Sequence, residues 1–212
     1  MASSDSTRGA VYLGTEQFAL SAGGLSGLGV THRLSCLQTK EEEREWMLYA
    51  ADSEAMPPPA LDFVEGSPDA SGIIVARCPL ADEDLFAPLA PPLLSQAAQF
   101  IDAAYQSGGT VFVHCTHAVS RSPTVVMWYL MHHHGMSVLQ ACERVKGCRV
   151  KTSPTEAFVE LLLDAGSSSS EQACGPSVSA GGEEAGAGPN AGESSTGDVS
   201  GPVPRDEVLA VL

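Results

Sequence analysis

Short runs of apolar residues alternate along this chain with segments whose apolar positions recur at helical spacing. The strand-like runs are residues 10–13, 30–37, 73–75 and 110–113. The helical patterns are residues 15–22, 40–51, 93–105, 124–134, 137–145 and 155–164. Strands that alternate with helices are typical of α/β proteins with a mainly parallel sheet. We therefore predict an α/β fold built around such a sheet.

Two segments depart from this alternation. Residues 56–72 are rich in proline, glycine, serine and acidic residues, which predicts a loop. From residue 166 onward large apolar residues are almost absent, so the segment cannot bury enough surface to offset its chain entropy. We predict a disordered, acidic, Gly/Ser-rich tail over residues 166–212. Its last eight residues, RDEVLAVL, are interpreted as a frayed end, with a helical turn or a docking peptide for an unknown protein as alternatives.

The chain is acidic, but its charge is unevenly distributed. It has 26 Asp and Glu residues against 11 Lys and Arg residues, a formal net charge of −15. This balance argues against nucleic acid as a partner and against electrostatic attachment to anionic membranes. Residues 152–212 carry ten acidic residues and one basic residue, whereas residues 114–151 carry five basic residues and one acidic residue. The second segment is therefore the part of the chain suited to an anionic ligand.

No segment predicts membrane insertion or export. Hydrophobic residues make up 43% of the chain, but no apolar run approaches the roughly 18 residues of a transmembrane helix. The first residues have no apolar signal centre, and Ala2 stands where myristoylation requires glycine. We expect a cytoplasmic protein, with the nucleus as the alternative location. The six cysteines form no CxxC pair, so we expect free thiols and neither a zinc site nor a disulfide framework.

The stretch with the clearest chemistry follows the predicted strand at residues 110–113. His114 and Cys115 come next, five residues follow, and Arg121 then precedes a Ser-Pro pair that opens an apolar helix. Proline suits the first turn of a helix, because its missing N–H has no partner there. The loop thus lies at a helix N-terminus, where N–H groups and the helix dipole favour an anion. Arg121 adds a planar fork that fits two phosphate oxygens. The thiolate of Cys115 would be placed for in-line attack on a phosphate bound there.

This H-C-x5-R-S segment resembles the signature of the cysteine-dependent protein phosphatases, and the longer string VFVHCTHAVSRSPTVVMWYLM resembles their dual-specificity branch. The similarity extends to the segments VYLG, LGVTH and FID and to Ser153-Pro154 with Phe158. It covers about residues 9–165, apart from an insertion at about residues 40–72. The resemblance implies a three-layer α/β catalytic domain with a central, mostly parallel sheet. It implies the small atypical type of this branch, which has no upstream kinase-docking domain.

The resemblance also implies roles for single residues. Cys115 would be the nucleophile, Arg121 would bind the phosphate, and Ser122 would donate to the thiolate and assist breakdown of the intermediate. His114 would orient the phosphate loop from beneath. The loop residues around the phosphate would be Thr116, His117, Ala118, Val119, Ser120 and Arg121. The family requires neither a metal nor a cofactor.

The family further requires an aspartic acid that protonates the leaving oxygen and then activates water. Asp82 and Asp84 are the candidates. The succession of strand, proline and aspartic acid after residues 73–80 favours Asp82, whereas counting back from Phe100 at the family's usual separation favours Asp84. A lengthened proline-rich stretch at residues 87–92 reconciles the two counts, and we favour Asp82.

One loop position departs from the family pattern. Ala118 stands where glycine is usual, and its methyl group is costly if the position requires a positive φ. We expect an enzyme that hydrolyses phosphotyrosine and phosphoserine or phosphothreonine in a phosphorylated protein substrate. One alternative is a phosphatase of a non-protein phosphomonoester, such as a phosphoinositide or an RNA 5′-phosphate. A second alternative is a weakly active phosphate-binding adaptor.

Other polar residues allow two interpretations each. Three consecutive histidines, residues 132–134, are interpreted as a solvated helix end, because neighbouring helical side chains point in directions too different to share one metal ion. His117 is interpreted as an exposed loop residue, with substrate contact as the alternative. A basic group forms either a positive rim around the site or a solvated face; its members are Arg144, Lys146, Arg149 and Lys151.

Overall fold

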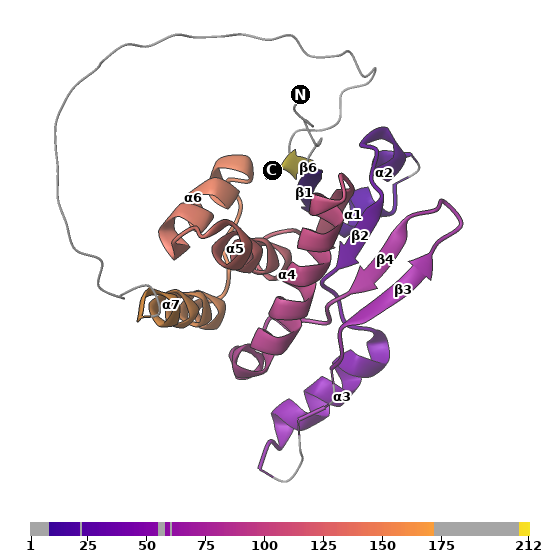
Figure 1. Cartoon of the computed structure of the whole chain (residues 1–212). Coiled ribbons are helices and arrows are strands. Elements are labelled where there is room, and N and C mark those ends of the chain that lie inside the picture. The colour runs from indigo at the N-terminus through magenta and orange to yellow at the C-terminus, as the bar shows by residue number, and fades with distance from the viewer. Residues whose placement is uncertain (1–8, 22, 55–57, 60, 172–207) are drawn as a thin grey trace, which may run out of the picture.

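The computed structural model describes residues 9–21, 23–54, 58–59, 61–171 and 208–212, which form a layered α/β domain (Figure 1). Its sheet has six strands in the order β3-β4-β2-β5-β1-β6. The strands are β1 (Ala10–Thr15), β2 (His32–Ser35), β3 (Val64–Pro68), β4 (Ile74–Arg77), β5 (Thr110–Cys115) and β6 (Val208–Ala210). The four central strands are parallel, and the edge strands β3 and β6 are antiparallel to their neighbours. The mostly parallel sheet predicted from the sequence is confirmed.

Helices cover both faces of this sheet. The first group is α1 (Glu16–Ala19), α2 (Gly24–Gly27) and α3 (Lys40–Ala51). After the 3-10 helix η1 (Asp84–Leu89) come α4 (Ala90–Gln106), α5 (Arg121–His134), α6 (Val138–Cys148) and α7 (Glu156–Glu171). Figure 1 shows α4 to α7 on one face of the sheet and α1 with α2 on the other. None of the helices in the described part of the chain combines the length and the apolar character needed to cross a bilayer.

Successive side chains of β5 point to opposite faces of the sheet and enter two different hydrophobic clusters. Val111 and Val113 belong to the large cluster beneath α4 and α5, whereas Phe112 belongs to the smaller cluster on the α1 face. The ring of Phe112 stacks on Phe18 of α1 with centroids 5.5 Å apart. Because β5 pairs with both β1 and β2, its carboxyl end is held from two sides. This end is where the predicted phosphate loop begins.

The apolar stripe expected on the helix before β5 is confirmed. Its residues are all buried, and they are Ala97, Phe100, Ile101 and Ala104. The hydrophobic pattern does not predict two short elements, α2 and β3. α2 lies between the predicted elements at residues 15–22 and 30–37, and β3 lies in the segment predicted as a loop. All five residues of β3 are exposed, so no apolar alternation marks this strand. Its pairing with the edge of β4 comes from backbone hydrogen bonds, which any sequence can supply.

The end of the chain differs from the expected frayed terminus. α7 continues to Glu171, and residues 172–207 of the predicted tail lie outside the described residues. Beyond them, β6 pairs with β1, and Val211 is fully buried in the main core. The Arg144 guanidinium Nε donates to the Val211 carbonyl at 2.8 Å. A single buried valine after three paired residues is too short a pattern for apolar periodicity to predict.

Candidate active site

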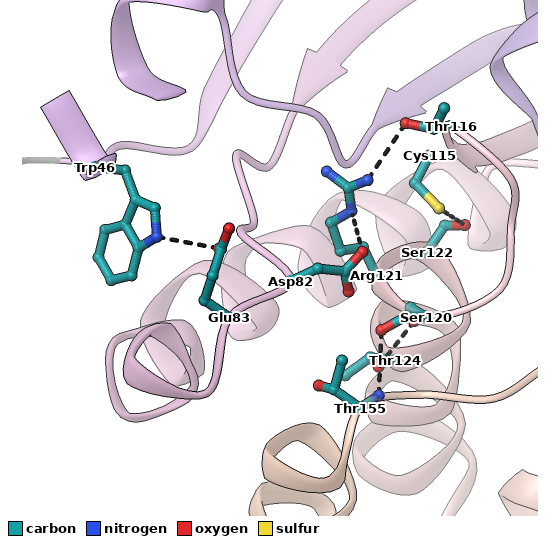
Figure 2. A network of polar contacts seen from close by, with 10 residues as sticks. All are labelled: Trp46, Asp82, Glu83, Cys115, Thr116, Ser120, Arg121, Ser122, Thr124 and Thr155. Atoms are coloured by element: carbon teal, nitrogen blue, oxygen red, sulfur yellow. Dashed lines mark hydrogen bonds and ion pairs between the residues drawn. The ribbon is translucent and has the colours of Figure 1, made fainter. Parts of the chain in front are cut away.

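The loop after β5 joins the carboxyl edge of the sheet to the N-terminus of α5 (Figure 2). Cys115 is the last residue of β5 and is 3% exposed. Ser122 lies in the first turn of α5, is fully buried, and donates its hydroxyl proton to the Cys115 sulfur at 3.2 Å. A hydrogen bond to sulfur favours the charged thiolate over the thiol. The structure thus brings together two of the residues predicted to act in catalysis.

Arg121 opens α5 and faces the segment after β4. Its Nη2 donates to the Thr116 hydroxyl at 3.3 Å, and its Nε lies 3.0 Å from Asp82 Oδ2 (Figure 2). The Nε–H does not point at the carboxylate, so the second contact is an ion pair without a hydrogen bond. The Asp82 side chain is 40% exposed, whereas that of Arg121 is 17% exposed. Asp84, the other candidate acid, begins η1 two residues later.

Ala118 adopts the conformation that glycine usually provides. Its φ is +51°, and within the described residues it is the one non-glycine residue with positive φ. Left-handed backbone costs an L-residue about 1–2 kcal/mol, because Cβ approaches the following carbonyl oxygen. The methyl group is fully buried, so its burial offsets part of this cost. The sequence expectation that this position strains the loop is consistent with the observed φ.

The remaining loop residues divide between buried anchors and an exposed rim. Ser120 is buried; its carbonyl accepts the Thr124 hydroxyl at 3.0 Å, and its own hydroxyl accepts the Thr155 N–H at 3.3 Å. Thr116 and Val119 are half-buried, whereas His117 is exposed. His117 therefore lies at the outer surface of the loop, as predicted. The ring contributes no hydrogen bond to the buried network.

His114 lies under the loop, but within the described part of the chain its ring does not make the hydrogen bonds that would orient the loop. Its side chain is 4% exposed and packs beside Phe112. Among the described residues neither ring nitrogen has a hydrogen-bond partner. Burial, with a smaller contribution from the positive charge of Arg33, lowers the pKa of His114 to about 4. The ring is therefore neutral near pH 7, and the His114 backbone carbonyl, which accepts the Cys36 N–H at 2.7 Å, is what ties this position to β2.

Helix α3, part of the predicted insertion, supports the segment that carries Asp82. The Trp46 indole N–H donates to Glu83 Oε2 at 3.1 Å, and Glu83 follows Asp82 directly (Figure 2). The Trp46 ring is 2% exposed and meets the Phe86 ring edge-on, with centroids 4.9 Å apart. One aromatic side chain therefore contacts the segment both next to Asp82 and in η1.

The start of α3 is attached to the strand that precedes this segment. Glu42 forms an ion pair and a hydrogen bond with Arg77 at the end of β4. Burial alone would raise the pKa of Glu42, but the hydrogen bonds from Arg77 and from the Thr39 backbone lower it. Thr39 and Glu42 also form a capping box that fixes the first turn of α3. The Asp82 segment is thus held by α3 at both of its ends.

Cys115 differs from the neighbouring buried cysteines in its surroundings. Burial raises the pKa of Cys78, and burial together with the Cys78 and Cys115 sulfurs raises that of Cys36 well above its ordinary value. These two groups remain neutral thiols in the core, as the sequence suggested. Among these three, Cys115 alone accepts the Ser122 hydroxyl proton, and its strand leads through the loop to the N-terminus of α5.

The structure changes the interpretation of Arg149 and adds detail to that of the three consecutive histidines. Arg149 belongs neither to a positive rim nor to a solvated face, because it is 6% exposed and bonded to the phosphate loop. The burial of Arg149 could not be predicted from the sequence, because nothing in a run of basic residues distinguishes a buried arginine from an exposed one. The three consecutive histidines of α5 contact separate partners: His132 stacks on Trp128, His133 pairs with Asp102, and His134 bonds to the Tyr129 hydroxyl.

Comparison with known proteins bears on this arrangement. The family model of the dual specificity phosphatase catalytic domain matches residues 11–168. Human dual specificity phosphatase 28 is 36% identical over 98 residues, which cover 45% of this chain and 53% of that protein. Dual specificity protein phosphatase 1 of Arabidopsis thaliana is 45% identical over 69 residues, covering 32% of this chain and 35% of that protein. The matches thus span about a third to a half of these curated relatives.

Solved structures have the same fold. The crystal structure of human DUSP28 matches with a TM-score of 0.55 at 23% identity, covering 76% of this chain and 94% of that one. The crystal structure of DUSP15 gives a TM-score of 0.55 at 25% identity, covering 78% and 88%. The residues that the family model matches include the loop after β5. The chain belongs to the dual-specificity phosphatase family.

Proposed function

We propose that this chain is a protein phosphatase that hydrolyses phosphotyrosine and phosphoserine or phosphothreonine through a cysteinyl-phosphate intermediate. The observation that supports this most directly is the 3.2 Å hydrogen bond from the buried Ser122 hydroxyl to Cys115, at the N-terminus of a helix that opens with Arg121. A sulfur held in this way is suited to nucleophilic attack. The guanidinium and loop amides are suited to stabilising charge on the transferring phosphoryl group.

In the proposed first step, the Cys115 thiolate attacks phosphorus while the bond from phosphorus to the substrate oxygen breaks. Asp82, protonated, gives its proton to that oxygen, so the product leaves as an alcohol or phenol. In the second step, water attacks the cysteinyl phosphate and Asp82, now a carboxylate, takes a proton from it. Inorganic phosphate leaves, and the thiolate is restored with the Ser122 hydroxyl as its donor. The balance requires no metal and no redox partner.

The Asp82 ion pair with Arg121 fits this assignment. The carboxylate lies against the guanidinium, 3.0 Å from Nε. A phosphate bound by this guanidinium would have the Asp82 carboxyl group as its neighbour, which places an acid near the leaving oxygen. We therefore assign the general acid to Asp82 rather than Asp84.

The activity is tested by comparing the wild-type chain with Cys115→Ser. Substrates are an aryl phosphate, phosphotyrosine and phosphothreonine peptides, an inositol phospholipid and a 5′-phosphorylated RNA. We expect turnover of both phosphopeptide classes that is lost in Cys115→Ser, and a phosphorylated protein after acid quench. Preferred turnover of the phospholipid or RNA would overturn the substrate class. Absence of Cys115-dependent turnover on every substrate would overturn the enzyme assignment.

The acid is tested with the pair Asp82→Asn and Asp84→Asn, which remove one charge each within the same segment. We expect Asp82→Asn to lower kcat about 10²-fold or more, the usual contribution of general acid catalysis. Asp84→Asn should stay within a few-fold of the wild type. A large loss in Asp84→Asn alone would transfer the role to Asp84.

A further inference from the structure

Arg149 lies behind the phosphate loop and is bonded to its backbone. It follows the last turn of α6, is 6% exposed, and points its guanidinium at two consecutive loop carbonyls. Its Nε donates to the Ala118 carbonyl and its Nη2 donates to the His117 carbonyl, both at 2.8 Å. Hydrogen bonds from a charged donor at this length are the stronger kind in proteins. A buried arginine with two such bonds is a fixed part of the loop's surroundings.

The segment that begins at Arg149 continues this contact along the loop. The Ser153 N–H donates to the Val119 carbonyl at 2.8 Å, and the Thr155 N–H donates to the Ser120 hydroxyl at 3.3 Å (Figure 2). Three successive carbonyls, those of His117, Ala118 and Val119, therefore accept hydrogen bonds from donors within residues 149–153.

These bonds determine which way the loop amides face. In a planar trans peptide the carbonyl of one residue and the N–H of the next point in opposite directions. If the carbonyls of residues 117, 118 and 119 point toward residues 149–155, the N–H groups of residues 118, 119 and 120 point away from them. We expect that opposite direction to lead into the concave side of the loop, between Cys115 and Arg121. The amides then converge where a phosphate would lie.

Ala118 makes this support necessary. Its φ of +51° is a conformation that is sterically costly for alanine and not for glycine. With glycine, the required backbone would carry no steric cost. With alanine, surrounding bonds must hold the peptide, and both peptides that flank Ala118 are held: the preceding carbonyl and its own carbonyl each bond to Arg149.

We propose that Arg149 is a positioning residue, which holds the strained loop at Ala118 so that its amides face the phosphate. This inference rests on the proposed function of the site. It concerns oxyanion binding, so it is testable without turnover. The formal positive charge of Arg149 also lies beside the loop, and a lysine in its place separates charge from geometry, since lysine lacks the planar fork.

The experiment measures the Kd of tungstate, a tetrahedral oxyanion, by calorimetry on the full chain, together with kcat/KM for an aryl phosphate. Arg149→Met removes the donors and keeps much of the stem. We expect at least a tenfold weaker tungstate Kd and a comparable loss in kcat/KM, the usual scale for groups that orient a binding residue. Arg149→Lys should lose most of the same affinity. Arg144→Met is the matched control, because it removes one charge from the same helix at a residue bonded to Val211.

A second background separates positioning from general stabilisation. In Ala118→Gly the loop backbone no longer carries the steric cost of the methyl group, so Arg149→Met should cost clearly less tungstate affinity there than with alanine. A purely structural arginine would instead lower Tm equally in both backgrounds and leave tungstate binding of the folded protein unchanged. If Arg149→Met does not fold, Arg149→Lys is compared in the two backgrounds in the same way.

The outcomes distinguish this inference from the proposed function. Tungstate Kd within twofold of wild type in a folded Arg149 variant, or equal losses with alanine and glycine at position 118, would overturn the positioning role alone. Arg149-dependent tungstate binding without turnover on any substrate would support the positioning role and overturn the enzyme assignment. A wild-type chain that does not bind tungstate would overturn both.

Discussion

Trp46 offers a test of whether helix α3 determines the position of the general acid. Trp46→Phe removes the indole donor to Glu83 Oε2 while keeping an aromatic ring near Phe86. Glu83 is exposed, so water replaces the lost donor and the hydrogen bond contributes only about 1 kcal/mol. Loss of the second ring from a side chain that is 2% exposed adds about 1–2 kcal/mol. We expect unfolding free energy to fall by about 2–3 kcal/mol.

The catalytic effect should depend on the leaving group. A nitrophenol leaves without much help, whereas a phenol of pKa about 10 needs the proton that we assign to Asp82. General acids contribute about 10²–10⁴-fold to a rate, and a displaced segment forfeits part of this. For Trp46→Phe we expect kcat to fall about tenfold with phenyl phosphate and about twofold or less with p-nitrophenyl phosphate. Steady-state kinetics below the Tm of the variant give both numbers.

Two companion variants complete this test. Glu83→Ala removes the acceptor without opening a cavity in the core, so it should reproduce the leaving-group dependence with a smaller loss of stability. Met47→Ala changes an exposed neighbour on the same helix and should alter neither quantity. Equal losses of kcat for both substrates, or a lower Tm with unchanged kcat for phenyl phosphate, would refute the idea that α3 positions the acid.

Three further predictions concern other parts of the molecule. Ser122→Ala should give a burst of product followed by slow turnover in stopped-flow assays, because the leaving thiolate loses its donor; a steady rate without a burst would contradict this. The pKa of His114 in the folded chain lies near 4, below the ordinary 6.5, so the unfolded chain binds the proton first as pH falls. The free energy of unfolding should therefore be unaffected by His114 above about pH 6.5 and should decline by up to roughly 3 kcal/mol toward pH 4. Urea titrations across this range should show the decline, and His114→Gln should reduce it. Val211→Ala should cost about 2 kcal/mol of unfolding free energy by the same method, since it uncovers the core beside β1, and no change would mean that β6 does not hold there in solution.

The sequence predicted those features that depend on local chemistry. The succession of strand, cysteine, five residues, arginine and helix carries its own geometry, because each residue is placed by its immediate neighbours. The stripe on α4 was likewise predictable, since helical spacing alone places Phe100 and Ile101 on one face. The strain at Ala118 was foreseen for the same reason, as it depends on one backbone position.

Features that depend on distant contacts were not predictable. Arg149 lies in a basic run with three similar residues, and only burial against the loop distinguishes it. Trp46, a large aromatic residue in an acidic helix, indicates that the helix has a buried face, but it does not indicate which loop covers that face. β3 and β6 are set by backbone pairing to sheet edges, which leaves little trace in side-chain character.

The pairing of β1 has a consequence for how the chain folds during synthesis. β1 is made before both of its neighbours in the sheet, which are separated from it by long stretches of chain: Val11 pairs with Val111, and Gly14 pairs with Val208. At about 5–20 residues per second, the last strand follows the first by roughly 10–40 seconds on the ribosome. Throughout this interval β1 has no partner on one edge or on both, and Val11 and Leu13, fully buried in the finished domain, remain available to chaperones or to other chains.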